Sequence, residues 1–490
     1  MSRYKHGIAT KRKKTKMPQP STGKSIVQVV VGTAPINTLD NPSEAVNKVI
    51  LLNDEEDVSN LIGDTTEIER YTIMHSVYAS FRKHMTAPIV AINVLDPENP
   101  NHVEVVVGEE YPVVKKVVTI EDLGILRDKV VVSEGETVYT AGDDYVTSFS
   151  DEGFLKIGIT GEGALKDKEK ITVAYSKLNP DGVSASDIIG GIDENMVKTG
   201  VELIDDVFPE TKLIPTVALA PIFSKYASVA LALESKVQKI YGMSNGIAFV
   251  DVATSGESGA KDYTKVKAAK EKNLPASRCA VPFWPLAKVD GMILSYSAFG
   301  AALLQSLTTK NKDIPSESID NQELLIDGIC TDDGTPVTMT QDDVNDYLNA
   351  YGIVGAVKLP EWKAWGNNTA AYPDSEDPID RWIKSVVMLN YLENKFKIDY
   401  LPRVGRNANY KLIEGIVSEF NMAMNSLVPD YLAGGEIVFR RKDNPLENIM
   451  KGRIKFSTRY ADYIPAEYIE NEFEYDVNFL ENALGGGENE

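Results

Sequence analysis

Hydrophobic and polar residues alternate in two runs near the end of the chain, at 453–460 and 472–479. The first run places Ile454, Phe456, Thr458 and Tyr460 on one face and Arg453, Lys455, Ser457 and Arg459 on the other. The second run places Phe473, Tyr475, Val477 and Phe479 opposite Glu472, Glu474, Asp476 and Asn478. A period of two predicts strands with one covered face. Because one polar face is basic and the other acidic, these strands are suited to pair with each other or with another molecule.

Earlier in the chain, apolar runs alternate with segments of helical periodicity. Ser25–Val31 and Pro88–Leu95 are predicted as buried strands, and apolar spacings of three and four predict a helix at Glu67–Met85. This βαβ order predicts a parallel sheet. After Ser184 the order resumes, with predicted helices at Glu194–Val207, Lys225–Tyr241 and Asp262–Lys272 and predicted strands at Leu213–Leu219 and Gly246–Val252.

The segment between these two α/β parts has a different pattern. From Tyr111 to Leu178 the sequence shows short strands separated by turn residues such as Ala141-Gly142-Asp143-Asp144. We therefore predict an all-β insertion, a sandwich or barrel, whose ends lie close together. The predicted fold class is α/β, with a mixed α/β core, an inserted all-β domain, an α+β C-terminal domain and extended N- and C-terminal arms. The predicted boundaries are 1–24 (N-terminal arm), 25–105 and 183–340 (middle domain), 106–182 (insertion), 341–468 (C-terminal domain) and 469–490 (C-terminal arm).

Charge is distributed unevenly in this chain, whose formal net charge is −21. Residues 1–24 carry eight basic and no acidic side chains, whereas residues 461–490 carry nine acidic and no basic ones. The strongly acidic balance disfavours nucleic-acid binding as the main role. In the N-terminal arm, the alternation of Tyr4, His6 and Ile8 predicts a short strand. The basic arm residues are Lys11, Arg12, Lys13 and Lys14, a pattern shared with nuclear-import and nucleic-acid patches, although the acidic remainder favours a partner of opposite charge.

The composition is that of a globular protein with room for several domains in its 490 residues. Only two cysteines occur, Cys279 and Cys330, so no disulfide framework is expected and a reducing compartment is the default. The sequence shows no secretory signal and no apolar run long enough to span a bilayer. We therefore expect synthesis and folding in a cytoplasm.

No constellation of residues predicts catalysis, a cofactor or a bound metal. The four histidines are His6, His75, His84 and His102, and none has metal-ligand spacing to another ligand. We expect His75 and His84 to be solvated or satisfied helix residues. Asp332-Asp333-Gly334 lacks the glutamate that would complete a calcium loop. Three tryptophans are interpreted as an aromatic core cluster of the C-terminal domain, namely Trp362, Trp365 and Trp382.

Six segments carry a family resemblance when they are taken together in this order. They are SRYKHGIA at 2–9, VVVGTAPIN at 29–37, IPSESIDN at 314–321, GIVGAVKLPEWKAWGNNTA at 352–370, DPIDRWIKSVVMLNYLENKFK at 377–397 and ADYIPAEYIENEFEYDV at 461–477. In combination they resemble the contractile tail sheath family of bacteriophages and related contractile injection particles. The resemblance covers both ends and most of the middle of the chain, and it covers the β-insertion least.

This resemblance implies a structural subunit, not an enzyme, that polymerises as a helical sleeve around a tail tube and contracts to drive the tube through a cell envelope. The implied partners are other copies of the chain, the tube protein, and baseplate and tail-terminator proteins, without nucleic acid and without direct membrane insertion. The implied location is a virion or phage-tail-like particle assembled in the host bacterial cytoplasm. By similarity, Arg3–Thr10 and Ile469–Leu480 are strands lent to neighbours, and Arg453–Tyr460 lies in the receiving sheet.

Two other classes of protein remain open. An α/β enzyme with an inserted β-domain would need titratable groups clustered in a pocket. A carbohydrate-binding particle protein would carry solvent-exposed aromatic side chains on the insertion, where Tyr111, Tyr139 and Tyr145 are the candidates.

Overall fold

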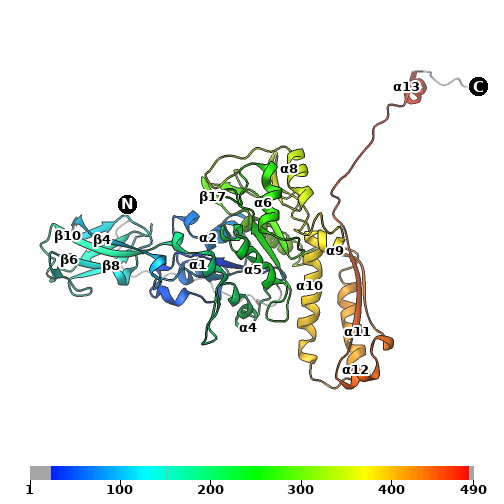
Figure 1. The fold of residues 1–490 in the computed structure, drawn as a ribbon, viewed down its shortest axis with the longest axis horizontal. Helices are drawn as coiled ribbons and strands as arrows, with labels where there is room; N and C mark the ends of the chain where they lie inside the picture. Colours follow the sequence, from blue (N-terminus) through cyan, green and yellow to red (C-terminus); the bar gives the residue numbers. More distant parts are fainter. Residues whose placement is uncertain (1–23, 151, 485–490) are drawn as a thin grey trace, which may run out of the picture.

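The computed structural model describes residues 24–150 and 152–484. Figure 1 shows a β-structured insertion (103–178) at one end, a central α/β body, and a C-terminal lobe (388–462) of long helices beside a two-stranded sheet. From this lobe the chain leaves as an extended tail (463–484). The mixed α/β class predicted from the sequence is confirmed. Among the described residues, no helix is long and apolar enough to cross a membrane.

The body is built on a six-stranded sheet with the strand order β15-β14-β13-β1-β3-β2. The strands are β1 (Gln28–Gly32), β2 (Ile50–Leu52), β3 (Ile89–Asn93), β13 (Val217–Leu219), β14 (Ile247–Asp251) and β15 (Ala280–Phe283). Neighbouring strands run parallel, except that β2 runs antiparallel to β3. Every residue of β1, β3 and β14 is buried. Burial on both faces explains why these strands appear in the sequence as continuous apolar runs.

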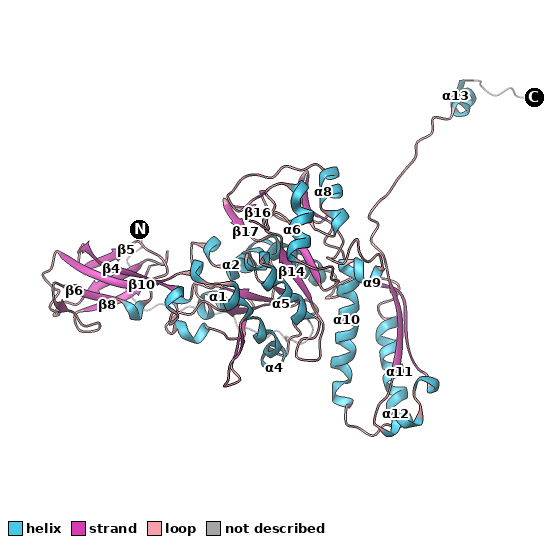
Figure 2. Cartoon of the chain, viewed as in Figure 1, coloured by secondary structure: helices cyan, strands magenta, loops and turns pink. Residues whose placement is uncertain are grey.

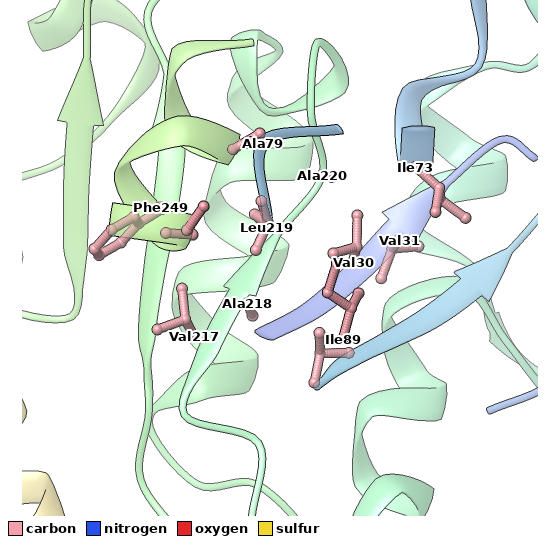
Figure 3. Packing of buried hydrophobic residues seen from close by; sticks show 14 of the residues in the cluster. Val30, Val31, Ile73, Ala79, Ile89, Val217, Ala218, Leu219, Ala220 and Phe249 are labelled. Carbon is pink, nitrogen blue, oxygen red and sulfur yellow. The ribbon is translucent and has the colours of Figure 1, made fainter. Parts of the chain in front are cut away.

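Helices lie around this sheet, in the connections between its strands and after its last strand (Figure 2). They are α2 (Thr72–Val77), α3 (Ala185–Ile189), α5 (Ala227–Val237), α6 (Val266–Asn273) and α7 (Tyr296–Lys310). Figure 3 shows the resulting core, in which Val30 of β1 lies beside Ile89 of β3, and Val217 of β13 and Phe249 of β14 belong to the same cluster. The predicted alternation of strands and helices therefore corresponds to one sheet, parallel except for β2, with helices around it.

Two predicted helices are interrupted in the structure. The helix predicted at Glu67–Met85 is a 3₁₀ turn, the short helix α2 and a π-helical turn at Tyr78–Lys83. Its start is fixed by Thr72, whose backbone N–H donates to the hydroxyl oxygen of Thr33 at 2.9 Å. The helix predicted at Glu194–Val207 is a short strand followed by a 3₁₀ helix at Gly200–Asp206. Gly200 has a φ of +58°, and its position against the carbonyl of Ile188 leaves no room for a Cβ atom, which breaks the predicted helix.

The insertion contains two sheets around one core. The four-stranded sheet has the order β4-β10-β6-β7, and the three-stranded sheet has the order β5-β9-β8. The strands are β4 (Val103–Pro112), β5 (Val117–Ile120), β6 (Val131–Glu134), β7 (Thr137–Val138), β8 (Tyr145–Phe149), β9 (Leu155–Ile159) and β10 (Lys170–Leu178). Its ends meet, because Val103 pairs with Leu178 and the N–H of Asn179 donates to the carbonyl of His102 at 2.7 Å.

The body also carries smaller elements around the main sheet. These are α1 (Glu55–Leu61), α4 (Val207–Thr211), α8 (Gln341–Tyr347) and α9 (Pro378–Arg381), with the strands β11 (Gly191–Ile192), β12 (Lys198–Thr199), β16 (Leu286–Val289), β17 (Met292–Leu294), β18 (Gly328–Cys330), β19 (Gly355–Leu359) and β20 (Glu361–Trp365). The hairpin β19–β20 contributes Ala356 and Ala364 to the core of the body. Part of the region predicted as a C-terminal domain thus packs with the preceding α/β elements.

The C-terminal lobe is an α+β arrangement of three helices and one hairpin of strands. Its elements are α10 (Ile383–Tyr400), α11 (Tyr410–Asn425), β21 (Leu432–Phe439), α12 (Leu446–Met450) and β22 (Phe456–Asp462). Helix α10 starts in the core of the body, where Ile383 and Val387 are buried, and continues into a separate core that contains Met388 and Leu392. One continuous helix therefore joins the lobe to the body.

The prediction of a single tryptophan cluster is wrong. Trp362 and Trp365 both lie on β20 and are half-buried, and their indole N–H groups donate to the Asp327 carbonyl and the Asn345 amide oxygen, respectively. Positions three residues apart on a strand point to opposite faces, so these two rings pack against different cores. Trp382 is buried at the start of α10. The three side chains have the same residue type but three different environments.

Candidate assembly interface

The lobe presents a two-stranded antiparallel sheet with a free edge. Strand β22 pairs with β21 in a register that sets Glu436 opposite Arg459, Ile437 opposite Thr458 and Phe439 opposite Phe456. No other strand in the described part of the chain joins this sheet. An unpaired strand edge presents a row of backbone N–H and C=O groups that accept an added strand.

The two edges of this sheet differ because α11 covers one of them at a single point. The side-chain amide of Asn421 accepts a hydrogen bond from the N–H of Ile437 at 2.8 Å and donates to the carbonyl of the same residue at 2.9 Å. Ile437 and its partner Thr458 therefore direct their backbone polar groups away from each other, as in the non-hydrogen-bonded pairs of an antiparallel ladder. It follows that Thr458 directs its polar groups to the outer edge of β22.

A packed core holds the sheet in place against α10 and α11. Ile437 of β21 and Phe420 of α11 are buried, and Phe456 of β22 packs on the same cluster. The ring of Phe396 on α10 lies 5.2 Å from that of Phe420 and 6.3 Å from that of Phe456, centroid to centroid. Aromatic contacts of this kind add stability beyond the buried area. The free edge therefore belongs to a well-supported element.

The strand predicted at Arg453–Tyr460 is present but shifted. Arg453, Ile454 and Lys455 precede β22, which begins at Phe456. Lys455 instead donates its N–H to the side-chain oxygen of Asn444 at 2.7 Å, which holds this residue in the loop. Arg459 lies on β22, but its acidic partner is Glu436 of β21, whose Oε1 accepts from Arg459 Nε at 3.0 Å. The acidic partner expected from the run at 472–479 is thus replaced by Glu436 on the neighbouring strand β21.

The tail differs from the strand that the alternation predicted. Residues 463–476 are extended and have no strand partner in the described part of the chain, and 477–484 form the helix α13 (Val477–Leu484). The exposed apolar side chains of the tail include Tyr468, Ile469, Phe473, Tyr475, Val477, Phe479 and Leu480. The acidic side chains Glu472, Glu474 and Asp476 alternate with Phe473 and Tyr475 in the extended part.

A strand is therefore the wrong secondary structure for Val477 and Phe479 in the single chain. The physical reason is the lack of a ladder partner, because an isolated strand leaves its backbone groups unpaired, whereas a helix pairs them within the segment. Asp476 supports the turn into α13, because its carboxylate accepts from the N–H of Asn478 at 2.8 Å. The N-terminal arm residues Tyr4, His6, Ile8, Lys11, Arg12, Lys13 and Lys14 lie outside the described residues.

Side-chain amides connect the lobe to the body along α10. The side chain of Asn394 accepts from the N–H of Asn245 at 3.0 Å and donates to its carbonyl at 2.8 Å. One turn earlier, Asn390 donates to the carbonyl of Gly246 at 3.1 Å. Sequence reasoning did not identify these asparagines or Asn421, because a single amide on a helix face gives no periodic signal.

A buried polar cluster around Asp251 has a structural role in the body. Asp251 at the end of β14 accepts hydrogen bonds from the N–H and hydroxyl of Ser297 at 2.9 and 3.0 Å and from the hydroxyl of Ser295. Burial raises the pKa of Asp251. His75, which was expected to be solvated or satisfied, is satisfied: its ring donates to the carbonyl of Glu69 at 3.0 Å and accepts from the N–H of Ser295 at 3.1 Å.

Neither alternative class of protein gains support from these positions. The Asp251 cluster is fully enclosed and ties the first turn of α7 to the sheet, whereas a reacting group must be reachable. On the insertion, Tyr139 and Tyr145 are core residues, so the exposed aromatic surface expected of a carbohydrate-binding module is absent at these positions. Among the described residues, no group of three or more His, Cys, Asp or Glu side chains is arranged to hold a metal ion.

Comparisons with known proteins agree with a structural, assembling subunit. No family model matches the chain. In sequence, the chain is similar to the tail sheath protein of Burkholderia phage BcepMu, with 24% identity over 516 residues and coverage of 99% of each chain.

The fold is similar to solved sheath structures over nearly the whole chain. For the PVC sheath complex of an extracellular contractile injection system in the contracted state, the identity is 13%, the coverage is 98% of this chain and 99% of that chain, and the TM-score is 0.56. For the contracted helical sheath of the anti-feeding prophage, the identity is 13%, the coverage is 96% and 99%, and the TM-score is 0.54. For a sheath tail protein of Listeria innocua, the values are 11%, 90% and 95%, and 0.50.

The shared fold is that of the solved sheath structures, an α/β body with a helical lobe, and in the described part of this chain the lobe carries a free sheet edge. The relationship in sequence extends over the full length and reaches a tail sheath protein. In sequence and in fold the chain is therefore similar to contractile tail sheath proteins of phages and contractile injection systems, and the resemblance found in its sequence segments is confirmed.

Proposed function

We propose that the chain polymerises as a helical sleeve around a tail tube and contracts to drive that tube through a cell envelope. One observation carries this proposal: the same chain has a free strand edge on β22 and an extended, apolar tail without a strand partner among the described residues. Extended segments add to exposed edges through main-chain hydrogen bonds, with side-chain contacts giving specificity. Each subunit can therefore lend one strand and receive another.

The positions of the two features favour an open assembly. The tail leaves the molecule from the end of β22 and points away from the lobe (Figure 1). A contact between the tail of one copy and the edge of another joins two different surfaces. Such heterologous contacts form rings or, where the rotation does not close, helical filaments. A sleeve of stacked rings is one outcome of this geometry.

The outer edge of β22 is the better receiving edge. On β21, the Asn421 side chain already binds the backbone of Ile437, and an incoming strand would have to displace it. On β22, the polar groups of Thr458 face outward at the corresponding position. The tail segment 472–476, with its alternation of Phe473 and Tyr475 with carboxylates, is the strand we assign to this edge. It would pair with a strand that carries the basic Arg459.

The remaining roles follow from the same proposal. The N-terminal strand with Tyr4, His6 and Ile8 is lent to a neighbour, and its basic segment binds acidic surfaces of that neighbour. The tube protein lies inside the sleeve, and baseplate and terminator proteins bind its ends in a particle assembled in the host bacterial cytoplasm. Contraction requires two packings of one mesh separated by a barrier, so the extended sleeve is held kinetically.

Electron microscopy of the full-length chain tests the proposal, and negative stain should show sleeves or tubes. Thr458→Pro should abolish them, because it removes an outward N–H of β22 without removing a bond of the chain's own ladder. Thr458→Val keeps the N–H and is the matched control. A folded Thr458→Pro variant that assembles normally would contradict the use of this edge. A wild-type chain that stays monomeric at high concentration would contradict the sheath function itself.

A further inference from the structure

The tail is attached to the body at one point after it has left the sheet. Arg381, at the end of α9, donates from Nη2 to Oε2 of Glu467 at 2.7 Å. Glu467 lies five residues beyond Asp462, the last residue of β22. Exposure of the side chains changes at this contact: Tyr463 and Ile464 are 46% and 48% exposed, whereas Tyr468 and Ile469 are 80% and 84% exposed. The tail therefore stays close to the protein up to Glu467 and leaves it afterwards.

Arg381 is held in a fixed orientation by three other residues. Its Nε donates to the side-chain oxygen of Asn368 at 2.7 Å. Its guanidinium lies 4.2 Å from the ring centroid of Tyr372 and 4.1 Å from that of Trp382. The side chain of Arg381 is only 19% exposed. A stacked, hydrogen-bonded guanidinium presents its remaining donors in a set direction, so it selects a carboxylate by position as well as by charge.

This environment joins two of the sequence segments that carry the family resemblance. Asn368 belongs to the segment at 352–370, whereas Arg381 and Trp382 belong to the segment at 377–397. The backbone connects them, because the N–H of Thr369 donates to the carbonyl of Arg381 at 2.8 Å, and Asn368 and Trp382 form a β-bridge. Another segment of the family resemblance, 461–477, contributes Glu467. The tryptophan-containing motifs thus build the site at which the tail is held.

A second contact fixes the start of the same stretch. Asp462 accepts a hydrogen bond from the hydroxyl of Ser385 at 2.7 Å, and Lys384 Nζ lies 4.0 Å from the same carboxylate. The side chains of Lys384 and Asp462 are 8% and 7% exposed. Residues 462 and 467 are therefore both anchored to the first turns around α9 and α10, and the five residues between them cannot swing freely.

We propose that Arg381 is a positioning residue that clasps Glu467, so that the movable part of the tail begins at Tyr468 and not at the end of β22. This inference deepens the proposed function, because it assigns the point about which the lent strand turns. Release of the clasp moves that point back to Asp462 and lengthens the free tail by five residues, about 16 Å if they are extended. The clasp therefore sets both the direction and the reach of the strand that is offered to a neighbour.

Limited digestion with chymotrypsin tests the clasp in the unassembled full-length chain, because one tyrosine lies on each side of it. In the wild type, cleavage after Tyr468 should be fast and cleavage after Tyr463 slow, as read from fragment masses. Arg381→Ala should raise the ratio of cleavage at Tyr463 to cleavage at Tyr468 by about ten-fold, because cleavage follows the population of the opened segment. Glu467→Gln should act in the same direction, and Arg381→Lys should give an intermediate ratio.

Arg403→Ala is the matched control, because it removes an equivalent ion pair, Arg403 to Glu419 at 2.5 Å, at a site remote from the tail. It should leave the cleavage ratio unchanged. Glu467→Gln keeps the test decisive if Arg381→Ala fails to fold, because Glu467 lies on the tail. An unchanged ratio in Glu467→Gln would overturn the clasp. The digestion needs no sleeve, so absence of sleeves in the wild type would count against the proposed function and not against the clasp.

Discussion

The side-chain amide of Asn421 binds both backbone polar groups of Ile437, at 2.8 Å to the N–H and 2.9 Å to the carbonyl. Ile437 and Leu432 are the two buried residues of β21. At Ile437, a side chain of helix α11 takes the place of a neighbouring strand. This contact satisfies the outward backbone groups of Ile437 on β21, whereas those of Thr458 on β22 stay open within the described part of the chain. The contribution of Asn421 to the stability of the lobe can therefore be measured by substitution.

Asn421→Ala should destabilise the lobe. The change leaves the N–H and carbonyl of Ile437 without their partner, and unpaired buried polar groups cost about 1–3 kcal/mol. Urea unfolding monitored by far-UV circular dichroism measures the loss of stability. Asn421→Asp should be less destabilising, because its carboxylate still accepts from the N–H of Ile437. It cannot donate to the carbonyl of Ile437, so that contact is lost. Equal stability of all three chains would show that water replaces the amide at no cost.

Gly300→Ala should destabilise the body, although alanine favours helices. Gly300 lies inside α7, and a Cβ atom there would lie 2.6 Å from the ring of Phe283 on β15. Overpacking of this kind costs about 1–3 kcal/mol. Phe283→Leu should recover part of the loss by making space. In the same protein, Gly415→Ala on α11 meets only the ends of the Arg403 and Glu419 side chains and should stabilise the chain by about 0.5–1 kcal/mol, as thermal or urea unfolding can measure.

Sequence patterns identified the body well because its strands are buried on both faces. The apolar runs at Ser25–Val31 and Pro88–Leu95 became β1 and β3, since no polar position interrupts a strand covered by helices. Helical periodicity found the helix within Glu67–Met85 but placed its start too early, because hydrogen bonds with Thr33 fix the helix start at Thr72. A local sequence pattern cannot reveal such a hydrogen bond, because its two residues lie far apart in the sequence.

The candidate interface was less accessible to sequence reasoning. Alternation located β22 within three residues, but it missed β21, where Gly434 and Gly435 interrupt the apolar pattern. It also assigned a strand to Val477 and Phe479, which lie in α13. The choice between strand and helix in such a segment depends on whether a ladder partner is present, and the sequence of one chain does not contain that information. Arg381 was visible only as part of a motif, without its role.

Acid should destabilise the body through His75. The ring is buried and neutral, donating to Glu69 and accepting from Ser295, and burial lowers its pKa to about 4. The unfolded chain binds a proton with a pKa of about 6.5. The unfolded state therefore holds more protons between these values, and the free energy of unfolding falls as the pH decreases from 6.5 to 4, by about 3 kcal/mol for this residue.

Unfolding measured at several pH values in wild type and in His75→Gln separates this contribution from those of other groups. The variant should be less stable at neutral pH, because its amide fits the two hydrogen bonds less well. Its stability should nevertheless fall less steeply between pH 6.5 and 4. His84, whose pKa burial also lowers to about 4, should maintain part of the slope in both chains. Parallel curves for the two chains would contradict a neutral buried His75.

Removal of the insertion should leave a folded chain that still assembles. His102 and Asn179 are joined by a backbone hydrogen bond of 2.7 Å, so a short glycine linker can replace residues 103–178 without moving either end. The insertion has a core of its own, which leaves with it. Two residues are exceptions, because Leu126 and Leu178 are buried in the core of the body. We therefore expect the deletion to destabilise the body by about 2–5 kcal/mol for each of these buried leucines.

The free edge of β22, Asn421 and the tail all lie outside the deleted segment, so none of the groups assigned to assembly changes. Negative-stain microscopy should show sleeves from the deleted chain that are narrower than those of the full chain if the insertion lies on the outside. The matched comparison is a chain with the insertion intact and the tail ended after Pro465, which should fold and form no sleeves. A deleted chain that unfolds cooperatively but never assembles would place the insertion in the mesh between subunits. In that case the acidic edge strand β4, where Val105 and Val107 are exposed, would be the surface to examine next.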